Sequence, residues 1–138
     1  MDDLKQEDTE AIGNDPTLLL VDDDKPFLQR LARAMESRGF QVTTAESVEE
    51  GIAAAKAAAP AYAVVDMRLG DGNGLDIIEA IRSRRADTRA IVLTGYGNIA
   101  TAVNAVKLGA IDYLSKPADA DEVLSLIHIS ERAGKADR

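Results

Sequence analysis

Three consecutive aspartates follow a short apolar run near the start of the chain. The run "LLLV" leads directly into Asp22, Asp23 and Asp24, and Lys25 and Pro26 come next. Carboxylates this close repel one another, and a buried unpaired charge is strongly unfavourable. Asp24 suits a helix cap followed by an early proline. Two strand-end acids are more than a cap needs, so the stretch indicates a bound cation.

Three further polar residues stand at the ends of later apolar runs. Asp66 follows "YAVV", Thr94 follows "AIVL" and Lys116 follows "AIDYLS". Each one alone has an ordinary explanation, because Asp66 and Lys116 could form a salt bridge and Thr94 could belong to a turn. Together with the aspartates, however, they form a set able to bind a phosphate and a hard cation.

The apolar runs alternate with segments of helical periodicity. We expect strands at residues 17–21, 41–45, 62–67, 90–95 and 110–115, and helices at 27–35, 48–59, 75–84, 99–109 and 119–130. Ser47 suits the N-cap of the second helix, with Glu50 three residues on. Strict alternation with apolar strands indicates a parallel sheet covered by helices on both faces, with ligands at the carboxyl ends of the strands.

The helix over residues 99–109 has an apolar stripe and little charge elsewhere. Ile99, Val103 and Val106 are spaced to lie on one face. We expect this face to pack into the core, which leaves an opposite face suited to a partner.

Phosphoryl transfer to a carboxylate is the chemistry that best uses this set. Asp66 is the candidate nucleophile, since acyl phosphates are known covalent intermediates. Mg²⁺ prefers oxygen ligands and takes one or two carboxylates, so Asp22, Asp23 and Asp66 can bind it. Lys116 and the Thr94 hydroxyl can each contact a phosphoryl oxygen.

Four motifs carry a resemblance to a known family. "LLLVDDD", "VVDMRL", "VLTGYG" and "DYLSKPAD", in this order, resemble the receiver domain of bacterial two-component response regulators over residues 16–126. The segment "GYGNIATAVNAVKLGAIDYLSKPADA" is similar to the RegA/PrrA/ActR group of redox-responsive global regulators in alphaproteobacteria. The resemblance implies an α/β fold: a doubly wound (βα)5 parallel sheet with strand order 2-1-3-4-5, like flavodoxin and the chemotaxis regulator.

The resemblance also implies how the site works. Asp66 would accept a phosphoryl group from a sensor histidine kinase. Asp23, Asp66 and the backbone carbonyl of Arg68 would bind magnesium directly, and Asp22 would act through water. Thr94 would contact the phosphoryl group.

Further implied roles concern switching and phosphate lifetime. Thr94 and Tyr113 would be the switch residues, and the surface of the last two helices and the last strand would change and form a homodimer. The peptide before Pro117 would be cis. Arg68 and Tyr96 would control the access of water to the phosphorylated aspartate.

Two other functions were weighed against this one. A haloacid-dehalogenase-like phosphatase would use Asp22, Asp24, Thr94 and Lys116, but it needs further acids after the lysine and more chain for a substrate cap. A receiver-like module that binds partners without phosphorylation remains the alternative. A calcium loop starting at Asp66 fails because Arg68 stands at its third position.

Composition limits the remaining possibilities. The 138 residues suit one domain, cysteine is absent, and the longest apolar runs fall short of the ~20 residues needed to cross a bilayer. The start shows no secretory pattern, so we expect a cytoplasmic protein without membrane contact.

The charge is unevenly distributed along the chain. Residues 1–15 hold six acids against one lysine, and residues 16–138 hold 18 acids against 15 bases. Such a balance offers no basic face for direct nucleic-acid binding.

We therefore expect three segments. Residues 1–15 form an acidic, disordered tail, residues 16–130 form the receiver domain, and residues 131–138 form a C-terminal tail with little likeness to the family. Regulators of the RegA type continue into a helix-turn-helix domain, which is absent from this sequence, so DNA contact is expected only through such an output domain.

Overall fold

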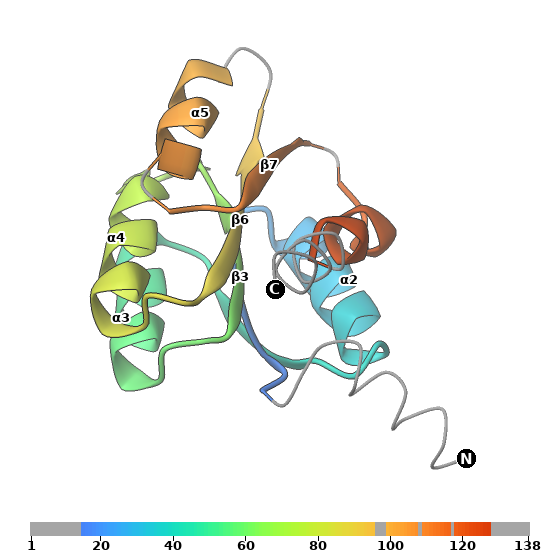
Figure 1. The fold of residues 1–138 in the computed structure, drawn as a ribbon. Coiled ribbons are helices and arrows are strands. Elements are labelled where there is room, and N and C mark those ends of the chain that lie inside the picture. The colour runs from blue at the N-terminus through green and yellow to red at the C-terminus, as the bar shows by residue number, and fades with distance from the viewer. Residues whose placement is uncertain (1–14, 96–98, 108, 117, 128–138) are drawn as a thin grey trace, which may run out of the picture.

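A five-stranded parallel sheet forms the centre of the computed structural model, which describes residues 15–95, 99–107, 109–116 and 118–127 (Figure 1). Its strands are β1 (Thr17–Val21), β2 (Gln41–Ala45), β3 (Tyr62–Asp66), β6 (Arg89–Thr94) and β7 (Asp112–Ser115). They lie in the order β2-β1-β3-β6-β7, and every neighbouring pair is parallel. The predicted doubly wound sheet with order 2-1-3-4-5 is confirmed.

Helices cover both faces of this sheet. The helices α3 (Val48–Ala57), α4 (Leu75–Arg84) and α5 (Ile99–Lys107) lie on one face, and α2 (Lys25–Glu36) lies on the other with a helical segment over residues 120–127 (Figure 1). Within the described residues, none of these helices has the length and apolar character needed to span a membrane.

The first two helices begin at the expected caps. The Asp24 carboxylate accepts a hydrogen bond from the Phe27 N–H at 3.2 Å, with Pro26 in the first turn. The Ser47 hydroxyl accepts from the Glu50 N–H at 3.0 Å, and the Glu50 carboxylate accepts from the Glu46 N–H. These bonds satisfy N–H groups that have no partner inside the helix.

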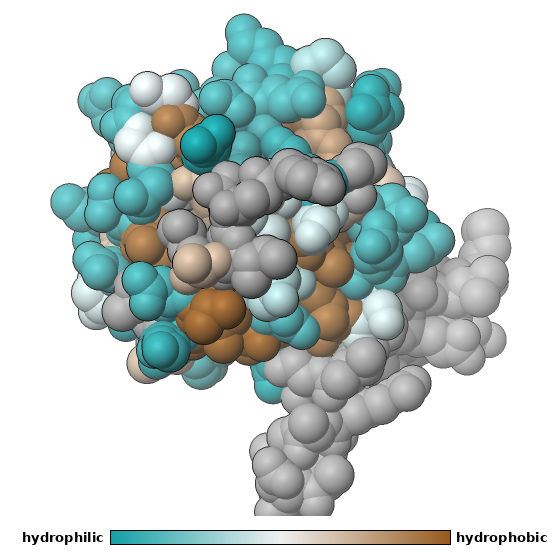
Figure 2. Space-filling model, turned by 90° about the horizontal axis from the view of Figure 1, so that it is seen from above, coloured by the Kyte–Doolittle hydropathy of each residue, from teal (hydrophilic) through white to brown (hydrophobic). Residues whose placement is uncertain are grey.

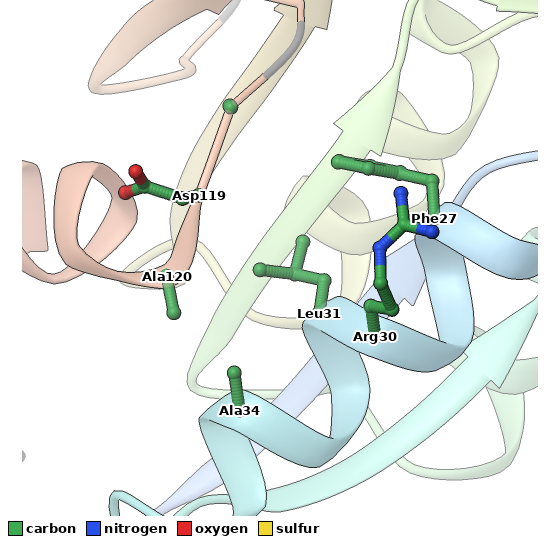
Figure 3. A pocket seen from close by; sticks show the side chains of 7 residues that line it. Phe27, Arg30, Leu31, Ala34, Asp119 and Ala120 are labelled. Carbon is green, nitrogen blue, oxygen red and sulfur yellow. The ribbon is translucent and has the colours of Figure 1, made fainter.

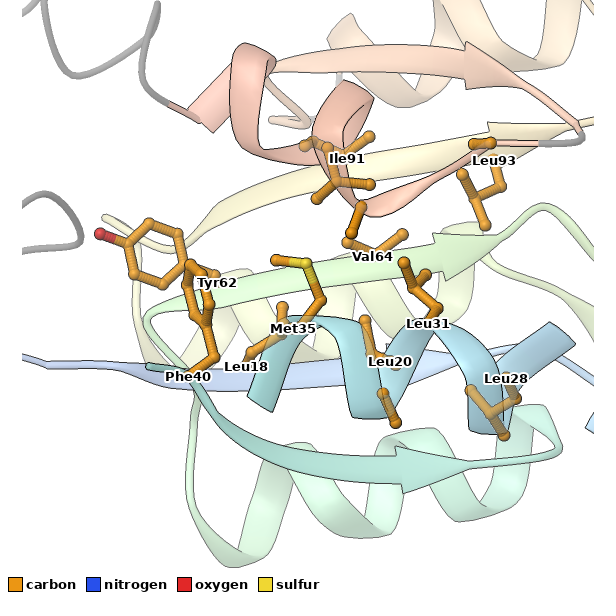
Figure 4. Close-up of a cluster of buried hydrophobic side chains, with 14 of the residues drawn as sticks. Leu18, Leu20, Leu28, Leu31, Met35, Phe40, Tyr62, Val64, Ile91 and Leu93 are labelled. Atoms are coloured by element: carbon orange, nitrogen blue, oxygen red, sulfur yellow. The ribbon is translucent and has the colours of Figure 1, made fainter. Parts of the chain in front are cut away.

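Alternate side chains of each central strand enter two separate apolar clusters. Leu18 and Leu20 of β1 pack with α2 (Figure 4). Leu19 and Val21 pack with α3 and α4. Both faces are covered, which explains why the central strands are apolar at nearly every position. β2 lies at the edge and is mostly exposed.

The segment after β3 forms a hairpin, where the glycine-rich "GDGNG" of residues 70–74 predicts only a turn. The strands β4 (Arg68–Leu69) and β5 (Gly72–Asn73) pair antiparallel, and the Gly74 N–H donates to the Met67 carbonyl at 3.0 Å. The chain therefore contains a short, hydrogen-bonded structure directly after Asp66.

The orientation predicted for α5 was wrong. Val103 is 41% exposed and Val106 is 37% exposed, while Ala105 is fully buried. At 100° per residue, the two valines share a stripe that turns away from Ala105. The structure does not describe the side chain of Ile99. Apolar spacing located the stripe but could not show which side faces the sheet.

Candidate functional site

The predicted polar set meets at the carboxyl edge of the sheet. Asp22 follows β1, Asp66 ends β3, Thr94 ends β6 and Lys116 follows β7. The parallel register aligns these ends, since Val21 pairs with Val65, Asp66 with Leu93 and Thr94 with Ser115. Seen from above, the molecule shows hydrophilic surface with hydrophobic patches between (Figure 2).

Lys116 joins the two buried carboxylates. Its Nζ atom lies 2.9 Å from Asp22 Oδ2 and 3.3 Å from Asp66 Oδ2. The same ammonium lies 5.2 Å from the centre of the Phe27 ring, within the range of a cation–π contact. Asp22 and Asp66 are 1% and 4% exposed, so this lysine supplies their positive charge inside the protein.

The other oxygen of each carboxylate accepts a backbone N–H. Asp22 Oδ1 accepts from Asp24 at 2.9 Å, and Asp66 Oδ1 accepts from Arg68 at 3.2 Å. These bonds fix both side chains against the loops that follow β1 and β3.

The acids also fit a metal ion. Asp22, Asp23 and Asp66 each place a carboxylate oxygen within 4.8 Å of the others, with Asp23 exposed. Asp22 Oδ2 is buried, and the Lys116 ammonium, 2.9 Å away, is the cation that offsets its charge. Three carboxylates lie close together, and Lys116 is the one cation paired with the two buried ones among the described residues, so the cluster suits Mg²⁺ or Ca²⁺.

Burial and charge shift the protonation of this cluster. Burial raises the pKa of the Asp66 carboxyl from the ordinary 3.8 to about 6, and the charge of Asp22 acts in the same direction. The Arg68 N–H and the Lys116 ammonium oppose this rise without cancelling it. Burial alone would lower the pKa of Lys116, but its contacts with Asp22 and Asp66 outweigh burial and raise it. Lys116 therefore offsets the negative charge of the two carboxylates only in part.

The two proposed switch residues lie near the site in different surroundings. The buried Thr94 hydroxyl donates to the Gly95 carbonyl at 3.2 Å. Tyr113 is half-buried and packs against the apolar cluster on the α3 and α4 side of the sheet. Two other residues of the sequence analysis, Tyr96 and Pro117, lie outside the described residues.

Sequence reasoning missed the role of Gly74. A Cβ atom there would lie 2.4 Å from the Asp66 carbonyl oxygen and 2.8 Å from Val65 Cγ1. Only glycine therefore allows α4 to begin so close to the end of β3. The three glycines of "GDGNG" are typical of a turn. The sequence alone does not show that Gly74, among them, is the one that packs against the Asp66 carbonyl.

A pocket borders the site on the α2 side. It has a volume of about 240 Å³ and lies between α2 and the chain that enters the 120–127 segment (Figure 3). Phe27 is one of its walls and also contacts Lys116, so the pocket and the acidic site share a side chain. The pocket is lined by Phe27, Arg30, Leu31, Ala34, Ala118, Asp119 and Ala120.

A doubly wound sheet with buried acids, a threonine and a lysine at its carboxyl edge defines the class of receiver domains. The family model of the response regulator receiver domain matches residues 18–128, and the chain belongs to this family.

Among individual proteins, the chain is similar to two regulators of alphaproteobacteria. It is 71% identical over 120 residues to the acid tolerance regulatory protein ActR of Sinorhizobium medicae, covering 87% of this chain and 62% of ActR. It is 70% identical over 112 residues to the photosynthetic apparatus regulatory protein RegA of Cereibacter sphaeroides, covering 81% of this chain and 61% of RegA. The chain thus spans about three fifths of the length of these relatives.

Solved structures show the same fold. A response regulator from Burkholderia pseudomallei with a phosphorylated aspartic acid, calcium ion and citrate superposes with a TM-score of 0.78 at 38% identity, over 89% of this chain and 72% of that one. A CheY-like receiver domain from Methanospirillum hungatei gives a TM-score of 0.78 at 26% identity, over 88% of this chain and 98% of that one.

The raised pKa of Asp66 predicts that Asp66→Asn stabilises the metal-free protein near pH 7, because the amide removes a buried charge. A carboxyl whose pKa rises on folding adds stability below pH ~4 and loses this contribution as the pH passes about 6. The advantage of the variant should therefore grow across this range to roughly 1–3 kcal/mol. Urea unfolding in a chelator at several pH values measures it.

Asp23→Asn is the matched control because Asp23 is exposed. In chelator its free energy of unfolding should stay within about 0.5 kcal/mol of the wild type throughout. Saturating Mg²⁺ should stabilise the wild type, by about 2.7 kcal/mol at 100 times Kd, and remove the advantage of Asp66→Asn. Equal stability of the wild type and Asp66→Asn at pH 7 in chelator would contradict the raised pKa.

Proposed function

We propose that this chain is the phosphoacceptor domain of a two-component system and accepts a phosphoryl group on Asp66 from a phosphohistidine of a sensor kinase in the cytoplasm. An Asp66 oxygen attacks the phosphorus, the new O–P bond forms, and the P–N bond breaks. The departing imidazole retains the electron pair of the P–N bond and takes a proton from solvent. The observation that carries the proposal is the Lys116 ammonium between two buried carboxylates, Asp22 and Asp66.

Each residue of the site has a distinct role in this proposal. Asp23, Asp66 and the Arg68 carbonyl would hold Mg²⁺ directly, and Asp22 would act through water. The ion supplies positive charge to the carboxylates and to the incoming phosphoryl group. Lys116 contacts one phosphoryl oxygen by a charge-assisted hydrogen bond, and Thr94 donates to another after leaving the Gly95 carbonyl. The phosphorylated aspartic acid and calcium ion in the Burkholderia structure support this assignment.

The output follows from movement of the two switch residues. As Thr94 turns toward the phosphoryl group, it leaves space into which Tyr113 rotates from its half-buried position. This movement changes the surface of α5, β7 and the 120–127 segment and favours a homodimer. In the longer regulators that the chain resembles, such a change would control transcription through an output domain.

Phosphorylation by acetyl phosphate and Mg²⁺ tests the proposal. Mass spectrometry should find one added phosphate on Asp66, and Asp66→Asn should take none. Asp23→Ala should slow the reaction severely in limiting Mg²⁺, because one direct carboxylate ligand is lost. Phosphate on Asp22 would favour the phosphatase alternative. A wild-type protein that takes no phosphate at any Mg²⁺ concentration would instead be a binding module.

The exposed valines predict that phosphorylation increases dimerisation through α5. Sedimentation with Mg²⁺ and beryllofluoride should show more dimer than without the mimic, because Val103 and Val106 can then be buried between copies. Val103→Asp should abolish this gain, whereas Ala53→Asp on the exposed side of α3 should retain it. An unchanged monomer fraction with and without the mimic would rule out this output.

Arg68 and Tyr96 are proposed to give the phosphorylated protein a long lifetime. Hydrolysis needs a water in line with the phosphorus, and neither side chain can act as a general base at neutral pH. The Arg68→Asn, Tyr96→Glu double variant should lose phosphate about tenfold faster, which corresponds to ~1.4 kcal/mol of barrier. The loss of phosphate from the phosphorylated protein over time measures the rate. A rate for the double variant within about twofold of the wild type would show that Arg68 and Tyr96 do not control the lifetime.

A further inference from the structure

The Asp71 side chain connects the segment after Asp66 to a different part of the fold. It stands between β4 and β5, at the tip of the hairpin that follows the phosphoacceptor strand. Its Oδ1 atom accepts a hydrogen bond from the Val48 N–H at 2.8 Å, and its Oδ2 atom accepts one from the Glu49 N–H at 3.1 Å. Both N–H groups belong to the first turn of α3. One carboxylate thus spans a separation of 22 and 23 residues in the chain.

The α3 helix already has its own cap. The Ser47 hydroxyl accepts from the Glu50 N–H at 3.0 Å, in the usual manner of a local N-cap. Asp71 satisfies the two preceding N–H groups from outside the helix, where its negative charge also suits the helix dipole. These hydrogen bonds lower the pKa of Asp71, so it is ionised at neutral pH. The contact with α3 therefore restrains the hairpin in addition to capping the helix.

Besides Asp71, the hairpin is attached to the body of the protein at its base and by the Leu69 side chain, which packs in the apolar cluster on the α3 and α4 side of the sheet. Arg68, Gly70, Gly72 and Asn73 are exposed, and the Leu69 side chain is buried. At its base the Gly74 N–H donates to the Met67 carbonyl, and Gly74 packs directly against the Asp66 carbonyl. At the tip, Asp71 is the residue that hydrogen-bonds the hairpin to α3 in the part of the chain that the structure describes. The base, the buried Leu69 side chain and the tip together determine how the hairpin is oriented.

The orientation of the hairpin matters because it includes Arg68. The Arg68 N–H donates to Asp66 Oδ1 at 3.2 Å, and Arg68 pairs with Asn73 across the hairpin. In the proposed function its backbone carbonyl is a metal ligand. A hairpin released at its tip could rotate about its base, which would move that carbonyl and the N–H that holds Asp66.

We propose that Asp71 is a positioning residue that holds the Arg68 backbone at the metal site by anchoring the hairpin to the N-terminus of α3. This inference rests on the proposed function, because it concerns binding of Mg²⁺ by the acids around Asp66. Coupling of this kind is reciprocal, so an ion bound at the site also strengthens the contact between Asp71 and α3. Outer contacts that orient a ligand commonly change metal affinity by 10–100-fold.

Asp71→Ala and Ser47→Ala form a matched pair that separates positioning from helix capping. Each removes a cap from the same helix end, so both should lower the free energy of unfolding. Only Asp71→Ala also releases the hairpin. Calorimetric titration with Mg²⁺ should show roughly tenfold weaker binding for Asp71→Ala and binding within about twofold of the wild type for Ser47→Ala. Asp71→Asn keeps one acceptor oxygen and should bind Mg²⁺ with intermediate affinity.

Amide hydrogen exchange provides a readout that a purely structural role would not move. In the wild type, Mg²⁺ should slow exchange of the Val48 and Glu49 amides and leave the Glu50 amide, held by Ser47, unchanged. Equal Mg²⁺ affinities of Asp71→Ala and Ser47→Ala, or equal protection of all three amides, would overturn the inference. A wild-type protein that binds no Mg²⁺ would overturn the proposed function instead, so the two failures are distinguishable.

Discussion

Repulsion between the buried carboxylates of Asp22 and Asp66 is the constraint on which the site depends. Both groups are almost inaccessible to water, and burial is the main reason that the pKa of Asp66 rises to about 6. Lys116 contacts both acids and offsets part of the repulsion. A cluster left with excess negative charge attracts a divalent cation. The same ion would stabilise the fold and take part in the proposed phosphoryl transfer.

The fold creates this constraint through the register of its parallel strands. Strands β1 and β3 are neighbours, so acids at their carboxyl ends must lie side by side. The Asp24 and Arg68 N–H groups fix the carboxylates. Helix α2 begins directly after Asp24, whereas α4 begins at Leu75, after the hairpin but close to the end of β3 in space. Gly74 allows this close start of α4 because it has no side chain. The arrangement is therefore held by the main chain as much as by the side chains.

Sequence reasoning succeeded where a residue's type and its place at a strand end both constrained the answer. Asp22, Asp66, Thr94 and Lys116 lie at one edge as expected, because a parallel sheet gathers its carboxyl ends there, and their chemical roles stay predictions. The strand order followed from the resemblance to the receiver family. The caps at Asp24 and Ser47 were found because capping is a local interaction, with donor and acceptor three residues apart.

Contacts between distant segments could not be predicted in this way. The side of α5 that faces the sheet depends on how the helix sits on its neighbours, so Val103 and Val106 were assigned to the core and are exposed. In the sequence, Asp71 is one acid in a glycine-rich stretch. Its hydrogen bonds to α3 could not be predicted, because they form only when the hairpin folds toward that helix. Phe27 is a core residue, and its contact with Lys116 depends on two elements far apart in the chain, so helical spacing could not predict it.

The buried acids carry excess negative charge that a divalent cation would neutralise. A pH titration of the Asp66 carboxyl carbon by NMR, with and without saturating Mg²⁺, measures this directly. We expect a midpoint at about 6 in chelator and a clear downward shift with Mg²⁺. A midpoint near 3.8 that is the same with and without the ion would mean that Asp66 has no raised pKa and binds no cation.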